Sequence, residues 1–301
     1  MKNLALFTSA LALFGAIVFN AHPVSAQSAP KKILFFSKSA GFEHDMIQEK
    51  NGQPSPAQVI LEKIAKENNF EITFTKDGSV FTPENIAKYD AFYFHTTGDL
   101  TTPGTDKNPP MSKEGKKAFL EAIHHGKGFI GTHCAADTFH TPGGVGWKND
   151  PNPDPYIQMI GGEFIIHGSQ QHARQICVDK NFPGFSDFPD DFSPLEEWYS
   201  LKNFAPNLHV LLVQDTSKMD KADGGNRKGY NRPDYPSTWA RMYGQGRVFY
   251  SSMGHRLDVW NNPVFQKVMI GGINWAVGNV TADVSPNLDK AAPEASTLPP
   301  E

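Results

Sequence analysis

The sequence predicts an α/β protein whose single domain contains a doubly wound, mostly parallel sheet. Strand-like and helix-like segments alternate from Lys32 to Thr132 in units of about 30 residues, the length of a βαβ crossover. The first strand-like run, residues 33–36, is apolar at every position, as a strand buried on both faces should be. A hydrophobic content of 39% and an aromatic content of 12% are sufficient to form a core.

Helices separate successive strands in the first half of the chain. The expected strands are residues 33–36, 70–75, 90–97 and 128–132, and the expected helices are residues 56–68, a short segment from Thr82, and residues 112–125. Pro56 and Pro83 suit the first turns of the first two helices. Thr82 can cap the helix that Pro83 begins, and Ser112 can cap the third helix. Gly126 ends the last of these helices. The strands should therefore run parallel, with helices on both faces of the sheet.

The second half of the chain is less regular. Strands are expected at residues 163–166, 175–178, 210–214 and 247–252, and a closing helix at residues 263–277. Two long loops, residues 137–155 and 217–236, interrupt them, and loops of this length are usually functional or mobile. The domain is expected to span residues 30–278. The tail, residues 279–301, is rich in Pro, Ala and charge and is expected to be disordered.

Residues 1–26 have the pattern of a signal peptide. Lys2 precedes an apolar run at residues 4–19, and Val24-Ser25-Ala26 is a small-x-small cleavage pattern. Cleavage is expected after Ala26. It would leave no membrane anchor and would place the mature protein in the periplasm or outside the cell.

The charge balance and the cysteine content exclude several classes of protein. Lys and Arg total 28 against 32 Asp and Glu, a formal net charge of −4, so no basic excess favours nucleic-acid binding. Two cysteines, Cys134 and Cys177, cannot form a thiolate zinc site or a disulfide scaffold. Whether they pair with each other stays open, because pairing requires a Cα separation below about 7 Å.

Histidines follow three of the predicted parallel strands. His44 lies in the loop after the first strand, His95 ends the third strand, and His133 ends the fourth. Open parallel sheets bind ligands beyond the carboxyl ends of their strands. We therefore expect these three histidines to open onto one cleft, joined by Glu197 and His255.

The segment after the fourth strand has the spacing of a sharp strand-to-helix turn. Such a turn needs small residues two positions before and two positions after the exposed side chain, and Gly131 and Ala135 flank His133 in this way. His133 therefore takes the place of the nucleophile in a G-x-C-x-G elbow. Cys134 stands one position later and is expected to point sideways into the protein. A Cys134 nucleophile is the alternative.

Several segments together resemble the ThuA-like (trehalose-utilisation) family. They are the Gly131-x-His133-x-Ala135 elbow, the opening FSKSAGFEHD, Met159-Ile-Gly-Gly-Glu163-Phe, EEWY at 196–199, and the closing GQGRVFYSSMGH and WAVG. The resemblance covers residues 32–278 and implies a flavodoxin-like fold of the class I glutamine amidotransferase-like type. It also implies a role in carbohydrate metabolism, particularly on oxidised (3-keto) glycosides.

The sequence departs from the amidotransferase pattern at two positions. That superfamily has a Cys at the elbow and a His-x-Glu near the C-terminus that deprotonates it. Here the elbow residue is His133, and His255 is followed by Arg256 and Leu257. Glutamine hydrolysis by the usual triad is therefore not expected.

An imidazole and carboxylate set is expected to replace that triad. The catalytic candidates are His133, His44, Glu197 and His255, and the substrate-binding candidates are His95, Asp99, His167 and Trp198. Histidine titrates near neutral pH and suits proton transfer next to a keto group. The same groups suit a divalent metal such as zinc, with His133, His167 and His255 as candidate ligands, and the cofactor stays open. Glu196 is adjacent to Glu197 and is expected to face solvent.

These features indicate an exported sugar-active enzyme, a hydrolase, lyase or isomerase acting on a glycoside or keto-sugar. The alternative is a non-catalytic carbohydrate-binding protein on the same fold, since fold does not dictate function. An enzyme needs convergent histidines with perturbed protonation, whereas a binding protein needs aromatic side chains facing a groove. The expected partner is a small-molecule carbohydrate, and the oligomeric state stays open.

Overall fold

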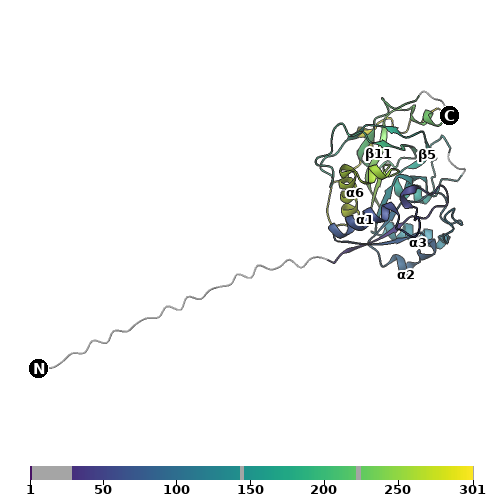
Figure 1. Ribbon diagram of the computed structural model, residues 1–301. Coiled ribbons are helices and arrows are strands. Elements are labelled where there is room, and N and C mark those ends of the chain that lie inside the picture. The colour runs from purple at the N-terminus through teal and green to yellow at the C-terminus, as the bar shows by residue number, and fades with distance from the viewer. Residues whose placement is uncertain (2–28, 143–145, 222–224, 301) are drawn as a thin grey trace.

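An eight-stranded sheet with helices on both faces forms the centre of the protein (Figure 1). The computed structural model describes residue 1 and residues 29–142, 146–221 and 225–300. The predicted signal peptide and its cleavage site therefore lie outside the described residues.

The strands of this sheet follow the order β2-β1-β3-β4-β12-β11-β10-β7. Their bounds are β1 Lys31–Phe36, β2 Phe70–Thr75, β3 Ala91–Phe94, β4 Gly128–Thr132, β7 Gln175–Cys177, β10 His209–Gln214, β11 Tyr235–Tyr243 and β12 Gly246–Ser251. Two small antiparallel ribbons accompany the sheet, one of β5 Glu163–His167 with β9 Tyr199–Lys202 and one of β6 Gln171–His172 with β8 Leu195–Glu196.

Most helices start at a proline preceded by a capping side chain, as the sequence predicts for the first two. The helices are α1 Pro56–Glu67, α2 Pro83–Ile86, α3 Lys113–His124, α4 Pro155–Ile160, α5 Leu257–Trp260, α6 Pro263–Ala276 and α7 Leu288–Ala291. Ser55 caps α1, Thr82 caps α2 and Ser112 caps α3, each through a hydrogen bond from a backbone N–H of the first turn.

The parallel half of the sheet confirms the predicted α/β class. β1 pairs in parallel with β2 and β3, β3 with β4, and β4 with β12. The remaining pairs, of β12 with β11, β11 with β10 and β10 with β7, are antiparallel. The carboxyl ends of β1, β3, β4 and β12 therefore meet at one edge, where the predicted histidines follow them.

Alternate side chains of the strands pack against different helices. In β1, Ile33 and Phe35 lie in a core formed with α1 and α6, whereas Leu34 and Phe36 lie in a second core formed with α3 and α4. Figure 1 shows α1 and α6 together on one side of the sheet. Because successive residues of a strand point to opposite faces, burial on both faces requires the uninterrupted apolar run seen in the sequence.

β11 is a long strand that the sequence does not indicate, because its first residues fall within the expected loop at residues 217–236. Pro236 near its start and the polar Ser237 and Thr238 argue against a central strand. In the structure these hydroxyls are paired internally: Ser237 Oγ donates to Gln175 Oε1 at 2.5 Å, and Thr238 Oγ1 lies 2.9 Å from Ser251 Oγ. Hydrogen bonds to side chains of other strands thus allow this polar segment to form a strand between β12 and β10.

Residues 279–300 pack against the sheet instead of forming the disordered tail that their composition predicts. Where β7 no longer covers β10, Asn287 takes its place: Val210 N–H donates to Asn287 Oδ1 at 2.6 Å, and Asn287 Nδ2 donates to Val210 O at 3.1 Å. Ala295 is buried, and the guanidinium of the buried Arg232 donates to its carbonyl oxygen at 2.6 Å. The amino-acid composition of the tail cannot indicate these specific hydrogen bonds, which is why it predicts disorder.

We expect Asn287→Ala to lower the free energy of unfolding by about 1–3 kcal/mol, because two hydrogen bonds to buried backbone groups are lost. Urea unfolding of the variant and the wild type measures the difference. Asn279→Ala is a matched control, since this amide lies at the exposed surface and donates to Asn274 Oδ1. Equal stability of both variants would show that Asn287 does not anchor the tail.

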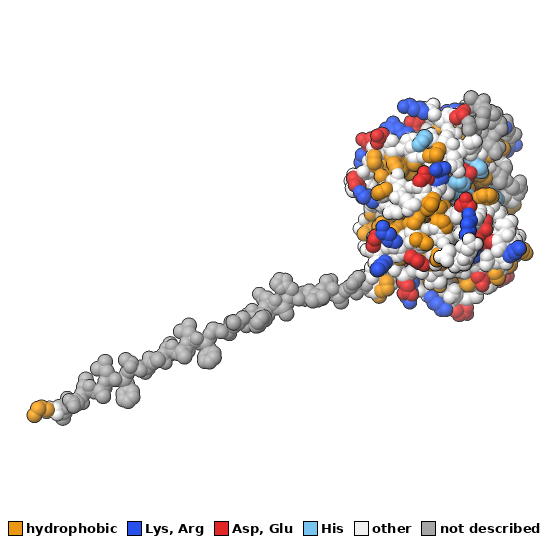
Figure 2. Space-filling model, viewed as in Figure 1, with side chains coloured by type: hydrophobic (Ala, Val, Ile, Leu, Met, Phe, Trp, Pro, Cys, Tyr) orange, Lys and Arg blue, Asp and Glu red, His pale blue; other side chains and the backbone are white. Residues whose placement is uncertain are grey.

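The surface agrees with the charge balance of the sequence. On the face seen in Figure 2, Lys and Arg side chains are interspersed with Asp and Glu, so that face carries no basic patch of the kind that binds nucleic acid. Among the described residues, none of the helices combines the length and the apolar character required to cross a bilayer.

Candidate functional site

His133 lies at a sharp turn where β4 ends and a 3-10 helix, His133–Asp137, begins. Its φ of +44° is in the left-handed region, which is uncommon for a residue with a side chain. A Cβ on Gly131 would lie 3.0 Å from the Cβ of Ala135, so the turn needs the small residues on which the elbow prediction depends. The strained turn places the imidazole at the carboxyl edge of the sheet.

Four side chains from four separate segments meet at this edge. They are His44 from the loop after β1, His133 from the elbow, Glu197 from between β8 and β9, and His255 from the segment after β12. The ring centroids lie 4.9 Å apart for His44 and His133, and 5.2 Å apart for His133 and His255. One potential ligand atom of each side chain lies within 4.8 Å of those of the others. We call these four side chains the His/Glu cluster.

Glu197 is the carboxylate of the His/Glu cluster, and its two oxygens contact three imidazoles. Oε2 lies 3.4 Å from His133 Nε2 and 3.1 Å from His255 Nδ1, while Oε1 lies 3.3 Å from His167 Nδ1. Burial raises the pKa of Glu197, but the contacts with His133 and His255 outweigh it and hold this pKa well below its usual range. Glu197 is therefore ionised at neutral pH.

The histidines of the cluster differ in their protonation. Burial, together with repulsion from His133 and His95, lowers the pKa of His44 well below its ordinary value. Burial also acts to lower the pKa of His255, but the contact with Glu197 outweighs it and raises this pKa. A neutral imidazole thus faces one that favours the protonated form, and such perturbed groups concentrate at functional sites.

Two groups outside the cluster hold it in place. His133 Nδ1 lies 3.1 Å from the carbonyl oxygen of Ser252. Glu196 is fully buried and does not face solvent as expected: its Oε2 accepts hydrogen bonds from the backbone N–H groups of Gly254, at 2.9 Å, and His255, at 3.2 Å. Glu196 therefore fixes the segment that carries His255. The adjacent pair of glutamates is visible in the sequence, but the partners of each depend on tertiary structure.

The structure places the other predicted histidines beside the cluster. His95 is fully buried next to His44, with ring centroids 5.8 Å apart, and its Nδ1 lies 3.0 Å from Thr132 Oγ1. The His167 side chain is 39% exposed and contacts Glu197 from the side opposite His133 and His255, through the other carboxylate oxygen. Both positions are compatible with contact to a ligand at the cluster.

Trp198 and Asp99, predicted to bind substrate, do not join the cluster. Trp198 is fully buried in the hydrophobic core, and its Nε1 donates to Gln171 O at 2.9 Å. Asp99 is exposed and accepts hydrogen bonds from the backbone N–H and the hydroxyl of Thr101. Large aromatic side chains gain much free energy from burial, and Trp198 has both a core to pack in and an acceptor for its N–H, which accounts for its place outside the cluster. Cys134 is a free, buried thiol.

A groove with a volume of about 960 Å³ opens next to His255. Its lining includes Phe42, Met46, Gln48, Gln170, His255, Arg256, Leu257 and Asp258. Phe42 and Leu257 are 67% and 51% exposed, which is unusual for large apolar side chains. The Phe42 ring lies edge-on to His44, with centroids 5.0 Å apart, so the groove leads to the His/Glu cluster.

The two sides of the groove are held rigidly. The carbonyl oxygen of Phe42 accepts a hydrogen bond from Thr97 Oγ1 at 2.9 Å. On the other side, Arg256 donates to both carboxylate oxygens of Asp258, at 2.8 and 3.0 Å, and to Gln170 Oε1. An exposed aromatic ring and a set of planar polar side chains therefore border the approach to the cluster. The sequence does not single out Phe42, although its position two residues before His44 is a usable signal.

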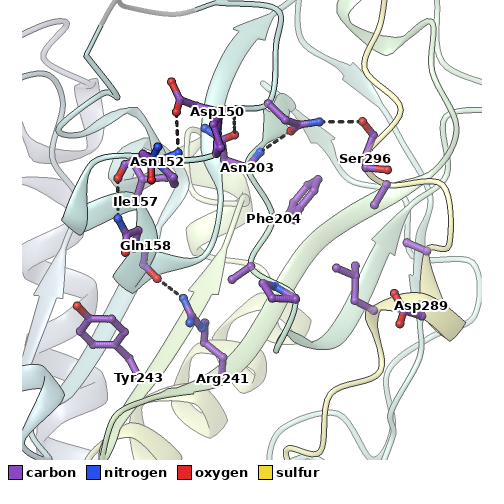
Figure 3. Close-up of a pocket in the computed structure, with 18 of the residues that line it drawn as sticks. Asp150, Asn152, Ile157, Gln158, Asn203, Phe204, Arg241, Tyr243, Asp289 and Ser296 are labelled. Atoms are coloured by element: carbon purple, nitrogen blue, oxygen red, sulfur yellow. Dashed lines mark hydrogen bonds between the residues drawn. The ribbon is translucent and has the colours of Figure 1, made fainter.

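A second cavity, of about 650 Å³, lies between the segment before α4 and the C-terminal tail (Figure 3). Its polar side chains bind one another or the backbone: Asn149 Nδ2 donates to Ser296 O at 2.9 Å, and Arg241 donates to the carbonyl oxygen of Gln158. None of the predicted site residues lines it. The groove, which His255 lines, is therefore the candidate site, and this cavity is not.

The 3-10 helix that begins at His133 ends at Asp137, which belongs to a partly buried charged network that contains none of the predicted site residues. His140 Nε2 lies 2.5 Å from Asp137 Oδ1, and His140 Nδ1 lies 3.4 Å from Glu163 Oε1. Lys202 Nζ lies 3.9 Å from the other oxygen of Glu163. Burial acts to lower the pKa of His140, but Asp137 and Glu163 outweigh it and raise this pKa to about 9. The Asp-x-x-His spacing after a strand end is the signal that could have identified it.

Within the described part of the chain, two groups of side chains have the composition and spacing to hold a metal ion. One is the His/Glu cluster, and the other consists of His44, His95 and Cys134. His167, a candidate ligand from the sequence, belongs to neither group. Imidazole nitrogens with a carboxylate are a common donor set for divalent first-row metals.

A protein-family model described as ThuA, trehalose utilisation, matches residues 32–276. Comparison of the sequence with curated proteins finds no match. The family model covers the whole sheet, the elbow and all four residues of the His/Glu cluster.

Solved structures share the fold. A ThuA-like protein from Bacteroides uniformis ATCC 8492 is 19% identical, with a TM-score of 0.62 over 85% of this chain and 95% of that one. A ThuA-like protein from Parabacteroides merdae ATCC 43184 is also 19% identical, with a TM-score of 0.55 over 90% of this chain and 97% of that one. At these identities the likeness shows the fold, and it confirms the predicted architecture.

Proposed function

This chain belongs to the ThuA (trehalose utilisation) family, and we propose that it is an exported enzyme of carbohydrate metabolism that acts on a glycoside or keto-sugar at the His/Glu cluster. The observation that carries the proposal is the convergence of three imidazoles and one ionised carboxylate at the carboxyl edge of the parallel sheet. This edge is where open parallel sheets bind ligands. Buried imidazole nitrogens without hydrogen-bond partners weaken a fold, so their concentration here favours a chemical role.

The charges of the cluster suit a reaction beside a sugar carbonyl. His44, whose pKa is lowered, is neutral and can accept a proton, while His255, whose pKa is raised beside Glu197, favours the protonated form and can donate one. Positive charge held at the cluster would also stabilise negative charge that develops on a sugar oxygen. A hydrolase, a lyase and an isomerase all need a proton acceptor, a proton donor and stabilisation of negative charge, so these roles support any of the three reaction types.

The groove supports a carbohydrate as the substrate. A pyranose ring has an apolar face of C–H groups and a rim of hydroxyls, so it needs a flat apolar surface and planar hydrogen-bonding groups around it. Phe42 offers a flat apolar surface, and the planar hydrogen-bonding groups are those of Gln170, Arg256 and Asp258. We therefore place a sugar ring of the substrate on Phe42, with the neighbouring ring or bond at the His/Glu cluster.

Phe42→Ala is expected to weaken binding of a disaccharide by about 3- to 10-fold, the effect of losing one aromatic stacking contact. Phe42→Trp should retain the affinity, because it keeps a flat apolar ring. Isothermal titration measures both. Val178→Ala removes a partly exposed apolar side chain outside the groove and serves as the control. If Phe42→Ala binds as tightly as the control, the sugar does not stack on Phe42.

A substrate screen tests the proposed function. Purified protein is incubated with trehalose, other disaccharides and their 3-keto derivatives, and the products are followed by mass spectrometry. Turnover by the wild type that is lost in Glu197→Gln would support the proposal. Binding of the same sugars without turnover would instead favour a carbohydrate-binding protein.

Export is proposed from residues 1–26 alone. N-terminal sequencing of protein recovered from the periplasm or the culture medium should begin at Gln27. Recovery of a chain that still begins at Met1 would contradict export through this segment.

A further inference from the structure

Three buried imidazole nitrogens of the His/Glu cluster make no hydrogen bond of good geometry among the described residues: Nδ1 of His44, Nε2 of His133 and Nδ1 of His255. The last two lie near Glu197 Oε2, at 3.4 and 3.1 Å, without the alignment of a hydrogen bond. A buried polar atom left without a partner costs about 1–3 kcal/mol, so native proteins rarely keep one, and three around a single carboxylate require an explanation.

The tautomer of His133 determines which of its nitrogens faces Glu197. Its Nδ1 lies 3.1 Å from the Ser252 carbonyl oxygen, which can only accept a hydrogen bond, so Nδ1 carries the proton. In the neutral imidazole, Nε2 then bears a lone pair, and it points toward Glu197 Oε2 at 3.4 Å. A lone pair facing an ionised carboxylate oxygen is repulsive, so this contact requires either a second proton on the imidazole or a metal cation that both atoms bind.

The spacing of the ligand atoms fits such a cation. A tetrahedral metal ion with bonds of about 2.0–2.1 Å separates neighbouring ligand atoms by about 3.3–3.4 Å. Glu197 Oε2 lies 3.1 Å from His255 Nδ1 and 3.4 Å from His133 Nε2, which is close to this separation. The His44 nitrogen lies within 4.8 Å of the other three atoms, so a small movement of its ring would bring it into the same shell.

We propose that His44, His133, Glu197 and His255 bind a single divalent first-row transition-metal ion at the inner end of the groove. The donor set selects this class, because imidazole favours zinc and its first-row neighbours, whereas calcium and magnesium take oxygen ligands. One carboxylate against a doubly charged ion leaves net positive charge beside the substrate. With the ion bound, His44 and His255 act as its ligands and not as the proton acceptor and donor of the metal-free site, and the ion would polarise a sugar oxygen or a water molecule in their place.

The residues around the cluster suit this role. The Ser252 carbonyl orients His133 with its free nitrogen inward, and Glu196 holds the backbone of His255, as partners of metal ligands commonly do. His167 contacts the Glu197 oxygen that faces away from His133 and His255, and it can orient the carboxylate without binding the ion.

The competing ligand set consists of His44, His95 and Cys134. It has no carboxylate, and none of its three side chains lines the groove, whereas His255 of the His/Glu cluster does. The two sets share His44, so they predict different effects of substitution at Glu197 and at Cys134.

Metal content tests the proposal without any sugar substrate. The inference deepens the proposed function, since it concerns the same four side chains, but its failure can be told apart from failure to find a substrate. The full mature protein is stripped with a chelator, reloaded separately with Zn²⁺, Mn²⁺, Co²⁺ or Ni²⁺, desalted, and analysed by elemental mass spectrometry. We expect about one ion per chain, a rise of several degrees in Tm on loading, and a visible absorption spectrum for the Co²⁺ form.

The variants identify the ligands. Glu197→Gln, which preserves shape, and His255→Ala should each lower metal affinity by about 100-fold or more, since even the partners of ligands contribute about 10–100-fold. His209→Ala is the matched control: His209 also pairs with a carboxylate, Asp179, at 3.0 Å, but among the described residues it belongs to no group with the spacing of metal ligands. His209→Ala and Cys134→Ser should keep the metal.

Two results would overturn the proposal. One is a folded wild-type protein, by circular dichroism, that retains no ion after reloading with any of the four metals. The other is loss of the metal in Cys134→Ser with retention in Glu197→Gln, which would assign the ion to the competing set.

Discussion

His133→Ala is expected to lower kcat/KM toward the sugar substrate by about 10²–10⁴-fold, whereas Cys134→Ser should keep most of the activity. The imidazole of His133 contacts Glu197 at the elbow and is required whether it transfers a proton or binds a metal. Cys134 is fully buried beside it, and burial raises the pKa of its thiol, so little thiolate forms at neutral pH. Substituting these two adjacent residues one at a time therefore distinguishes a functional His133 from a Cys134 nucleophile.

Activity, metal content and alkylation should be measured together on both variants. The wild-type enzyme is expected to resist iodoacetamide, because the Cys134 thiol is inaccessible and protonated. His133→Ala should lose bound metal along with activity. If Cys134→Ser were inactive and His133→Ala active, Cys134 would be the nucleophile and an amidase-type mechanism would replace the one proposed here.

The parallel half of the fold was predictable because its signals are local. The inner strands β1, β3 and β4 contain apolar runs buried on both faces, and the helices α1, α2 and α3 start at the capping residues Ser55, Thr82 and Ser112. Once the strands are known to be parallel, their carboxyl ends must share an edge. That is why the meeting of His44 with His133 could be expected from the sequence.

The antiparallel half was less predictable because its order depends on distant partners. β11 contains a proline and several polar residues, and its hydroxyls are satisfied only by side chains of other strands. The tail is held by Asn287 and Arg232, which pair with backbone groups far along the chain. Likewise, only the tertiary structure shows that Glu196 holds a backbone segment while Glu197 faces the histidines.

The same limit applies to the network of Asp137, His140 and Glu163. Two carboxylates contact one imidazole, and Lys202 lies 3.9 Å from the second oxygen of Glu163. Glu163 is fully buried, so its charge must be compensated within the protein. A protonated His140 provides that compensation. The stability of the fold should then depend on the proton of His140.

We expect the free energy of unfolding to fall by roughly 2–3 kcal/mol relative to a His140→Gln variant as pH rises from about 6 to about 9.5. The folded state raises the pKa of His140 from 6.5 to about 9, so the stabilising effect is fully present below pH 6.5 and is lost as pH passes 9. Urea unfolding at several pH values measures it. Subtracting the variant removes contributions of other groups that titrate in this range, including His255. His125→Gln, at an exposed helix end, should leave the profile of the wild type unchanged. A wild type and a His140→Gln variant with parallel profiles would mean that His140 is neutral in the fold and that Lys202, with the hydrogen bonds donated by Thr141 and Asn203, compensates Glu163.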